Sequence, residues 1–143
     1  MRSESENRAA ILAEARSWIG TPYHPCSRLK GVGVDCAQIL IGVYSAVGLV
    51  EPFETGHYPR DWMLHRDEER YLEWVQKYAH QVDAPRPGDI AMFKFGRCVS
   101  HGAIVTDWPT LIHAYSREGN VCYGDGTRGE LGPRLHSFYS VFE

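Results

Sequence analysis

The segment from Cys36 to Val47 constrains the fold more than any other part of the chain, because it is apolar on nearly every side. Its apolar residues are Ile39, Leu40, Ile41, Val43, Tyr44 and Val47. Asp35 before it is a typical N-cap, and Gly48 after it is a typical helix-ending residue. A helix that is apolar all round is normally buried. We therefore predict a central helix at about residues 36–47, with the rest of the chain packed around it.

The other segments divide into helices first and strands later. Helical periodicity predicts helices at about residues 4–19, with Ser3 and Glu6 at the spacing of a capping box, and at about 67–78. Residues 51–65 have the character of a loop. After Ala84, turn residues separate five short strands, at 90–95, 101–105, 111–115, 121–123 and 135–141. This order predicts an α+β fold, in which an antiparallel sheet of about five strands packs on the central helix.

Length and composition narrow the possible classes of protein. We expect residues 1–143 to form a single domain, because neither half could bury its apolar face alone. A net charge of −3 gives no sign of a nucleic-acid-binding protein. The opening MRSESENRAA is unlike a secretory signal, and no apolar run approaches the ~18 residues of a membrane span. These features predict a protein made in the cytoplasm, with no membrane partner.

Cys36 stands out among the four cysteines, none of which lies in a CxxC pair. It falls in the first turn of the predicted central helix, where the helix dipole is expected to lower the pKa of a thiol. Backbone N–H groups at a helix start can also donate to an oxyanion. Cys36 is therefore a candidate nucleophile, and the alternative is a small buried apolar residue. Cys26, Cys98 and Cys122 are more simply incidental or structural.

His101 and His113 lie on successive strands joined by the turn at residues 107–110, which predicts an antiparallel hairpin. Strand alternation places both histidines on one face, close to the same level. His101 could then take the Cys36 proton while His113 orients its ring. Two alternatives remain open. The histidines could be ordinary strand residues that are bonded to the backbone, or they could bind zinc together with Cys36, although such a site lacks a clear fourth ligand. We expect no metal and no cofactor.

Five blocks of the chain, in this order, resemble the signature of NlpC/P60 cell-wall peptidases. They are Gly20–Tyr23, Gly33–Cys36, Arg86–Ile90, His101–Val105 and Leu111–Ala114. The resemblance implies a papain-like α+β fold with Cys36 as nucleophile, His101 as general base and His113 as the third polar residue. It also implies that Tyr23 and Asp35 contact the substrate, although Asp35 could serve only as an N-cap and Tyr23 only as a packed aromatic. The implied substrate is the γ-D-glutamyl to diamino-acid bond of peptidoglycan stem peptides.

The compact sequence from Leu29 to Gln38 looks most like the phage and prophage branch of that family. The resemblance therefore implies association with a phage tail, tail proteins as partners and a place in the virion. One departure matters: Ala37-Gln38 stands where the family commonly has Ser-Gly after the cysteine. Two alternatives follow, a catalytically inactive tail-tip component and another thiol acyl-transfer enzyme, such as an amidase or acyltransferase, on the same fold.

Overall fold

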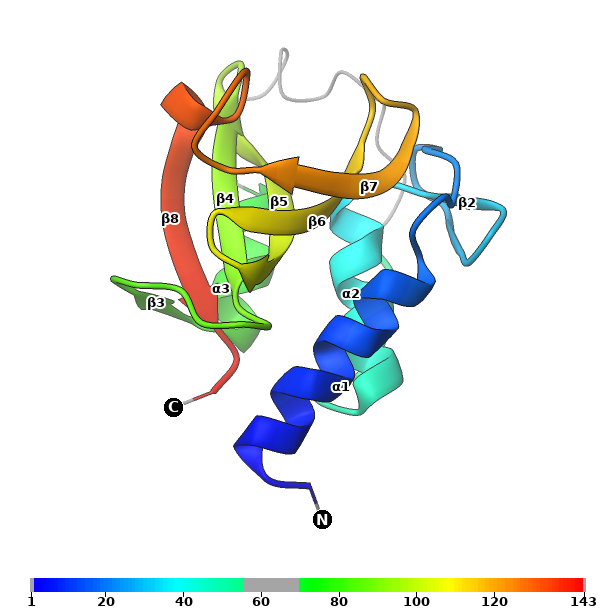
Figure 1. Ribbon diagram of the computed structural model, residues 1–143. Coiled ribbons are helices and arrows are strands. Elements are labelled where there is room, and N and C mark those ends of the chain that lie inside the picture. Colours follow the sequence, from blue (N-terminus) through cyan, green and yellow to red (C-terminus); the bar gives the residue numbers. More distant parts are fainter. Residues whose placement is uncertain (1, 56–69, 143) are drawn as a thin grey trace.

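A computed structural model describes residues 2–55 and 70–142, and Figure 1 shows their arrangement. Helices α1 (Glu4–Ser17) and α2 (Cys36–Val47) run side by side against a curved sheet, and α3 (Arg70–Tyr78) contacts β5 of the same sheet. The strands are β1 (Arg28–Leu29), β2 (Gly33–Val34), β3 (His80–Val82), β4 (Ile90–Phe95), β5 (Cys98–Asp107), β6 (Thr110–Tyr115), β7 (Asn120–Asp125) and β8 (Leu135–Ser140), with a short 3-10 helix η2 (Gly132–Arg134) before β8. The predicted α+β class is confirmed.

The main sheet has six strands in the order β3-β8-β4-β5-β6-β7, and its pairs are antiparallel. The prediction of about five strands is therefore corrected. The strand that was missed, β3, has three residues and lies at the sheet edge, where it pairs only with β8. Its sequence, His-Gln-Val, carries a single apolar residue and so shows no alternation. The small β1–β2 sheet, of two residues in each strand, was missed for the same reason.

Local capping chemistry explains where the first two helices begin and end. Ser3 and Glu6 make both bonds of the predicted capping box at the start of α1. Helix α2 covers the predicted residues, and Gly48 ends it with φ 86°, in the left-handed region that glycine tolerates. Helix α1 ends at Ser17, two residues before the predicted end. The expected start of α3 at Asp67, and most of the expected loop at 51–65, lie outside the described residues.

Each face of the sheet carries its own apolar cluster. The larger cluster joins α1, α2 and α3 to the sheet through residues such as Ile39, Tyr71 and Ile104. The smaller cluster includes Ala103, Val105 and Leu111. Eight of the twelve residues of α2 are at most 6% exposed, so the prediction of a buried central helix is confirmed. The start of α2 is thereby held firmly against the middle of the sheet.

Candidate active site

Asp35 fixes the start of α2 as its N-cap. Its carboxylate accepts hydrogen bonds from the backbone N–H of Ala37 at 3.1 Å, Gln38 at 2.9 Å and Cys26 at 2.8 Å. Gln38 occupies the capping-box position, but its side chain donates to Thr55 Oγ1 at 2.9 Å and accepts from Arg28 at 3.2 Å. Gln38, one of the two residues that depart from the NlpC/P60 pattern, therefore ties the helix start to β1 and to the segment that carries Thr55.

The Cys36 thiol lies at the first residue of α2 and is 9% exposed. Its Sγ donates to the carbonyl oxygen of Ser100 at 3.4 Å, and the side chain of Tyr23 is hydrogen-bonded to it. Burial and, to a lesser extent, the charge of Asp35 raise the pKa of the thiol, although the bond to Tyr23 and backbone bonds oppose this change. The shift is opposite to the predicted one, and the loss of hydration is its largest cause.

A β-bulge in β5 supplies the carbonyl group that holds the thiol. Phe93 of β4 pairs with His101, whereas the next residue, Lys94, pairs with Val99, so Ser100 is an extra residue in the ladder. A bulge of this kind leaves one residue unpaired and changes the direction of its neighbours, and it often occurs next to active sites. The sulfur of Cys36 is therefore anchored on the residue directly before His101.

His101 and His113 contact each other directly. Nε2 of His101 lies 2.8 Å from Nδ1 of His113, and the two side chains are 6% and 2% exposed. Strands β5 and β6 form the predicted hairpin, and their register places both rings on one face as diagonal neighbours. Burial lowers the pKa of His113 to about 4, and burial together with the neighbouring His113 lowers that of His101 well below 6.5. Both imidazoles are therefore neutral at pH 7.

The loop that carries Tyr23 is held between two strands. Tyr23 forms a parallel bridge with Val34 of β2, and Pro22 forms an antiparallel bridge with Asn120 of β7. The backbone N–H of Tyr23 also donates to the carbonyl oxygen of Gly119 at 2.8 Å. Because of these bonds the Tyr23 side chain reaches the Cys36 thiol from a fixed position. The structure thus brings Cys36, Tyr23 and Asp35 together at the start of α2, beside the bulge of β5.

Three residues around the site were not singled out from the sequence. Ser100 holds the thiol through its carbonyl oxygen, Tyr115 stacks on His113, and Gly124 leaves room for the His113 ring. Strand alternation does place Tyr115 on the face of His113. The bulge and the close approach of β7 have no comparable sequence signal, because both depend on how strands pair.

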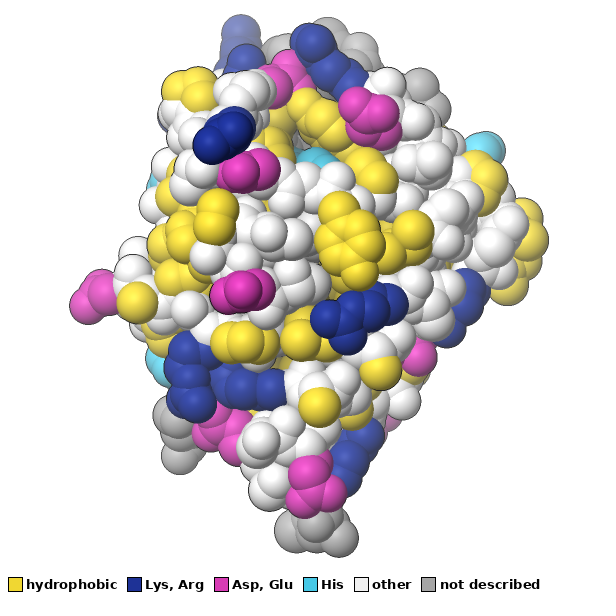
Figure 2. Space-filling view, viewed as in Figure 1, with side chains coloured by type: hydrophobic (Ala, Val, Ile, Leu, Met, Phe, Trp, Pro, Cys, Tyr) yellow, Lys and Arg dark blue, Asp and Glu magenta, His cyan; other side chains and the backbone are white. Residues whose placement is uncertain are grey.

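Figure 2 shows a hollow in the molecular surface. A histidine side chain lies inside it, and hydrophobic side chains surround it. Within residues 2–55 and 70–142, no three His, Cys, Asp or Glu side chains are grouped so as to hold a metal ion. None of the helices in this part of the chain is long and apolar enough to span a bilayer.

Comparison with known proteins gives structural matches only. No protein-family model matches the sequence, and no curated protein matches it. The NlpC/p60 domain of the peptidoglycan hydrolase SagA aligns with 93% of this chain and 97% of its own, at 22% identity and a TM-score of 0.64. An NLP/P60 lipoprotein-like protein of Staphylococcus aureus aligns with the whole chain at 19% identity and a TM-score of 0.70. This chain covers 44% of the length of the Staphylococcus protein.

Two proteins of Mycobacterium tuberculosis show that catalysis varies on this fold. The peptidoglycan hydrolase RipB matches 97% of this chain and 66% of its own at 17% identity, with a TM-score of 0.66. RipD, described as a non-catalytic NlpC/p60 domain protein adapted to peptidoglycan binding, matches 93% of this chain and 95% of its own at 15% identity, with a TM-score of 0.57. The described residues therefore have the NlpC/P60 fold, and the chemistry of this chain must be inferred from its own site.

Proposed function

We propose that the protein is a cysteine peptidase that cuts amide bonds in the stem peptides of bacterial peptidoglycan. The observation that carries this proposal is the buried 2.8 Å contact between two neutral histidines, next to the strand residue that holds the Cys36 thiol. Two proteins with this fold, SagA and RipB, are peptidoglycan hydrolases. No metal or cofactor takes part in the proposed reaction.

The proton positions follow from the contact between the histidines. If His101 Nδ1 accepts the Cys36 proton, Nε2 of His101 must carry a hydrogen and donate it to Nδ1 of His113. His113 must then be neutral, with its own hydrogen on Nε2. A His113 pKa of about 4 keeps it neutral at pH 7. His113 therefore fixes the tautomer of His101, as the third member of a catalytic triad does.

The proposed reaction is acyl transfer through a thioester. The Cys36 sulfur attacks the amide carbonyl carbon as its proton passes to His101, and the oxyanion accepts from the Cys36 N–H. The C–N bond then breaks, and the amine leaves with the proton from His101. Water, activated by the same imidazole, hydrolyses the thioester and restores the thiol. Because burial raises the thiol pKa, the resting site is a neutral thiol and imidazole, and proton transfer accompanies attack.

The finer assignments come from the sequence resemblance. They are the γ-D-glutamyl to diamino-acid bond as target, Tyr23 and Asp35 as substrate contacts, and action within a phage or prophage tail. The contact of Tyr23 with the thiol and the position of Asp35 at the helix start support the two substrate contacts. Detection of the chain in purified phage or prophage particles by mass spectrometry tests the tail assignment, and consistent absence from such particles would reject it.

Purified muropeptides of known sequence test the activity. Wild-type protein is expected to release fragments that mass spectrometry assigns to one bond, and Cys36→Ala is expected to release none. Cys122→Ala is a matched control for the loss of a thiol: Cys122 pairs with His113 across β6 and β7, but it is not the proposed nucleophile, so cleavage should persist. Wild-type protein that cleaves none of a panel with different diamino acids would contradict the proposal.

One observation favours a second candidate function, binding of peptidoglycan without cleavage. The Cys36 thiol is nearly buried and has a raised pKa, and RipD shows that the fold serves a non-catalytic protein. The two functions differ in a binding experiment. A pure binding protein would bind intact stem peptide with equal affinity before and after Cys36→Ala and would never form a thioester. A trapped Cys36 acyl adduct would exclude this candidate.

A further inference from the structure

We propose that Tyr115 and Glu130 are positioning residues that hold the His113 ring, and through it the His101 ring, in their working orientation. Neither residue belongs to the proposed triad, and their effect on catalysis rests on the proposed function. Their effect on the histidines themselves does not depend on that function. Three sets of contacts carry the inference.

Tyr115 lies face to face with His113. The two ring centroids are 4.7 Å apart with an interplanar angle of 16°, and the Tyr115 ring also lies 5.6 Å from that of His101. Residues 113 and 115 share one face of β6, so the stack is a direct result of strand alternation. A flat ring stacked at this separation restricts rotation of the imidazole about its χ2 angle, which is otherwise soft.

Glu130 holds the Tyr115 ring in place. Its carboxylate accepts a hydrogen bond from the Tyr115 hydroxyl through one oxygen, and its other oxygen lies 2.9 Å from Arg117. The Glu130 side chain is 20% exposed, whereas that of Arg117 is 73% exposed. Glu130 comes from the connection between β7 and η2, so this contact ties a separate segment of the chain to the end of β6. Because Arg117 balances its charge, Glu130 orients the tyrosine without placing a net charge beside the histidines.

The backbone of β7 closes the edge of the His113 ring that carries Nε2. A Cβ added to Gly124 would lie 2.8 Å from Nε2 of His113, so β7 already occupies the space next to that nitrogen. The ring is thus bounded by His101 at Nδ1, by Tyr115 on one face and by β7 at Nε2. Removal of the Tyr115 contact opens one of these three boundaries and leaves the other two unchanged.

Nitrogen-15 NMR of the histidine side chains in the full chain measures the predicted effect directly. In the wild type, the His113 ring is expected to show one tautomer, with hydrogen on Nε2. Tyr115→Phe keeps the stack but loses the hydroxyl, and Glu130→Ala removes its acceptor. Both are expected to move the ring shifts toward a mixture of tautomers. Glu130→Gln keeps an acceptor oxygen and is expected to restore the wild-type spectrum.

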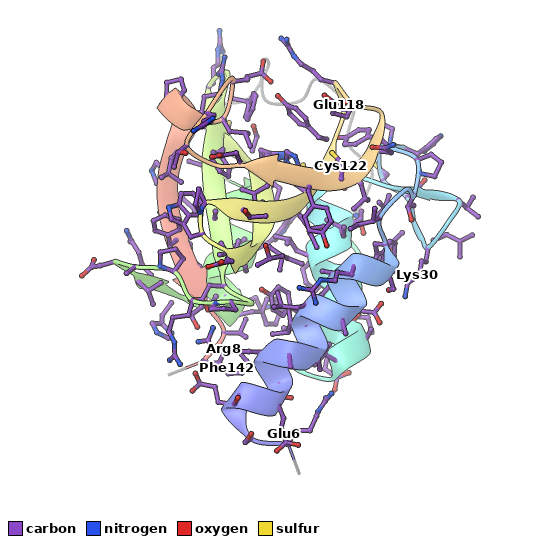
Figure 3. The ribbon with its side chains drawn as sticks, in the orientation of Figure 1. Glu6, Arg8, Lys30, Glu118, Cys122 and Phe142 are labelled. Carbon is purple, nitrogen blue, oxygen red and sulfur yellow. The ribbon has the colours of Figure 1, made fainter. Side chains whose placement is uncertain are left out.

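If the chain cleaves muropeptides, the same variants separate orientation from binding. Tyr115→Phe and Glu130→Ala are expected to lower kcat about 10-fold with KM changed less than 2-fold, because misplacement of a catalytic group slows the chemical step. Glu118→Ala is the matched control, because it removes the same charge from the exposed turn before β7, close to Cys122 in Figure 3. It should change neither the ring shifts nor kcat.

The two readouts keep the two proposals apart. Altered histidine shifts in a chain that cleaves no muropeptide would support the positioning role and contradict the peptidase. Histidine shifts identical to wild type in both Tyr115→Phe and Glu130→Ala would overturn the positioning role, whatever the activity. Backbone amide spectra that stay unchanged away from the site show that each variant is folded.

Discussion

Two buried polar clusters at opposite ends of α1 and α2 differ in how they handle charge. At the N-terminal end of α1, Arg8 is 8% exposed and lies 2.8 Å from Asp89, which is 2% exposed. Burial alone would lower the pKa of Arg8, but its bonds to Asp89 and Glu4 more than offset this, so the pKa is raised. At the start of α2, the buried thiol and imidazoles all have pKa values shifted toward their neutral forms.

The difference separates a buried charge with compensating partners, which supports folding, from buried neutral groups, which we expect to support the proposed chemistry. Arg8 also donates to Pro87 and Ser140 and lies 4.5 Å from the centre of the Phe142 ring, a pair that Figure 3 shows side by side. Its charge is thus compensated, and the cluster ties α1 to the start of β4 and to the end of β8, which are neighbouring strands. The thiol is held by the Ser100 carbonyl group and by Tyr23, and the two histidines contact each other, so these partners are neutral groups. We expect the first cluster to control stability and the second to control activity.

The largest expected effect is the loss of activity in His101→Ala. Removal of the proposed general base should lower kcat by a factor on the order of 10³. Since a neutral side chain is removed, no buried charge is left unpaired, and the free energy of unfolding should change far less than in an Arg8 variant. Urea unfolding and muropeptide cleavage measure the two quantities. A variant that keeps its activity would show that His101 is not the base.

Arg8→Ala is expected to show the opposite pattern. It leaves the buried Asp89 carboxylate without its cation, which should lower the free energy of unfolding by about 3–5 kcal/mol, as measured in urea. Activity per folded molecule should stay at the wild-type level. The double variant Arg8→Met with Asp89→Asn removes both charges and should recover part of the loss. A double variant no more stable than Arg8→Ala would mean that packing, not the unpaired charge, sets the cost.

Acid should lower the free energy of unfolding, because His113 must be protonated when the chain unfolds. His113 has a pKa of about 4 in the folded chain, against about 6.5 when unfolded. Between these two pH values only the unfolded state binds the proton. The contribution of neutral His113 to the free energy of unfolding is therefore complete above pH 6.5, and it falls as the pH drops toward 4. The loss should reach about 3 kcal/mol at pH 4. Urea unfolding of the wild type and of His113→Asn, each at pH 7 and pH 4, isolates the loss that is due to His113. An equal change in the free energy of unfolding in both proteins would contradict the prediction.

The smallest expected effect concerns two glycines of one region. Gly124→Ala places a methyl group 2.8 Å from His113 Nε2, whereas Gly126→Ala places one 2.4 Å from the Trp108 ring. Overpacking should cost each variant about 1–3 kcal/mol of unfolding free energy. Only Gly124→Ala is expected to lower kcat as well, by about 10-fold, because only it displaces the ring. Equal activities of the two variants would show that His113 tolerates displacement.

Local signals explain why much of the fold could be predicted from sequence. The bounds of α2 follow from Asp35, a continuous apolar run and Gly48, and the shared face of His101 and His113 follows from alternation across a short turn. The raised thiol pKa could not be predicted, because it depends on how much water the packed sheet excludes. The β-bulge at Ser100 and the contact between Tyr115 and Glu130 depend on pairing between segments distant in sequence.

The bonds that fix Tyr23 also protect the sheet from unwanted association. Segment 20–23 exchanges backbone hydrogen bonds with Val121 of β7 and with Gly119 just before it, so the last strand of the sheet presents few open donors and acceptors along this stretch. The opposite border is β3, a strand of only three residues. Exposed strand borders invite pairing between molecules, and short or covered ones discourage it. Neighbouring copies of the protein should therefore have little tendency to join strand to strand, even at high concentration.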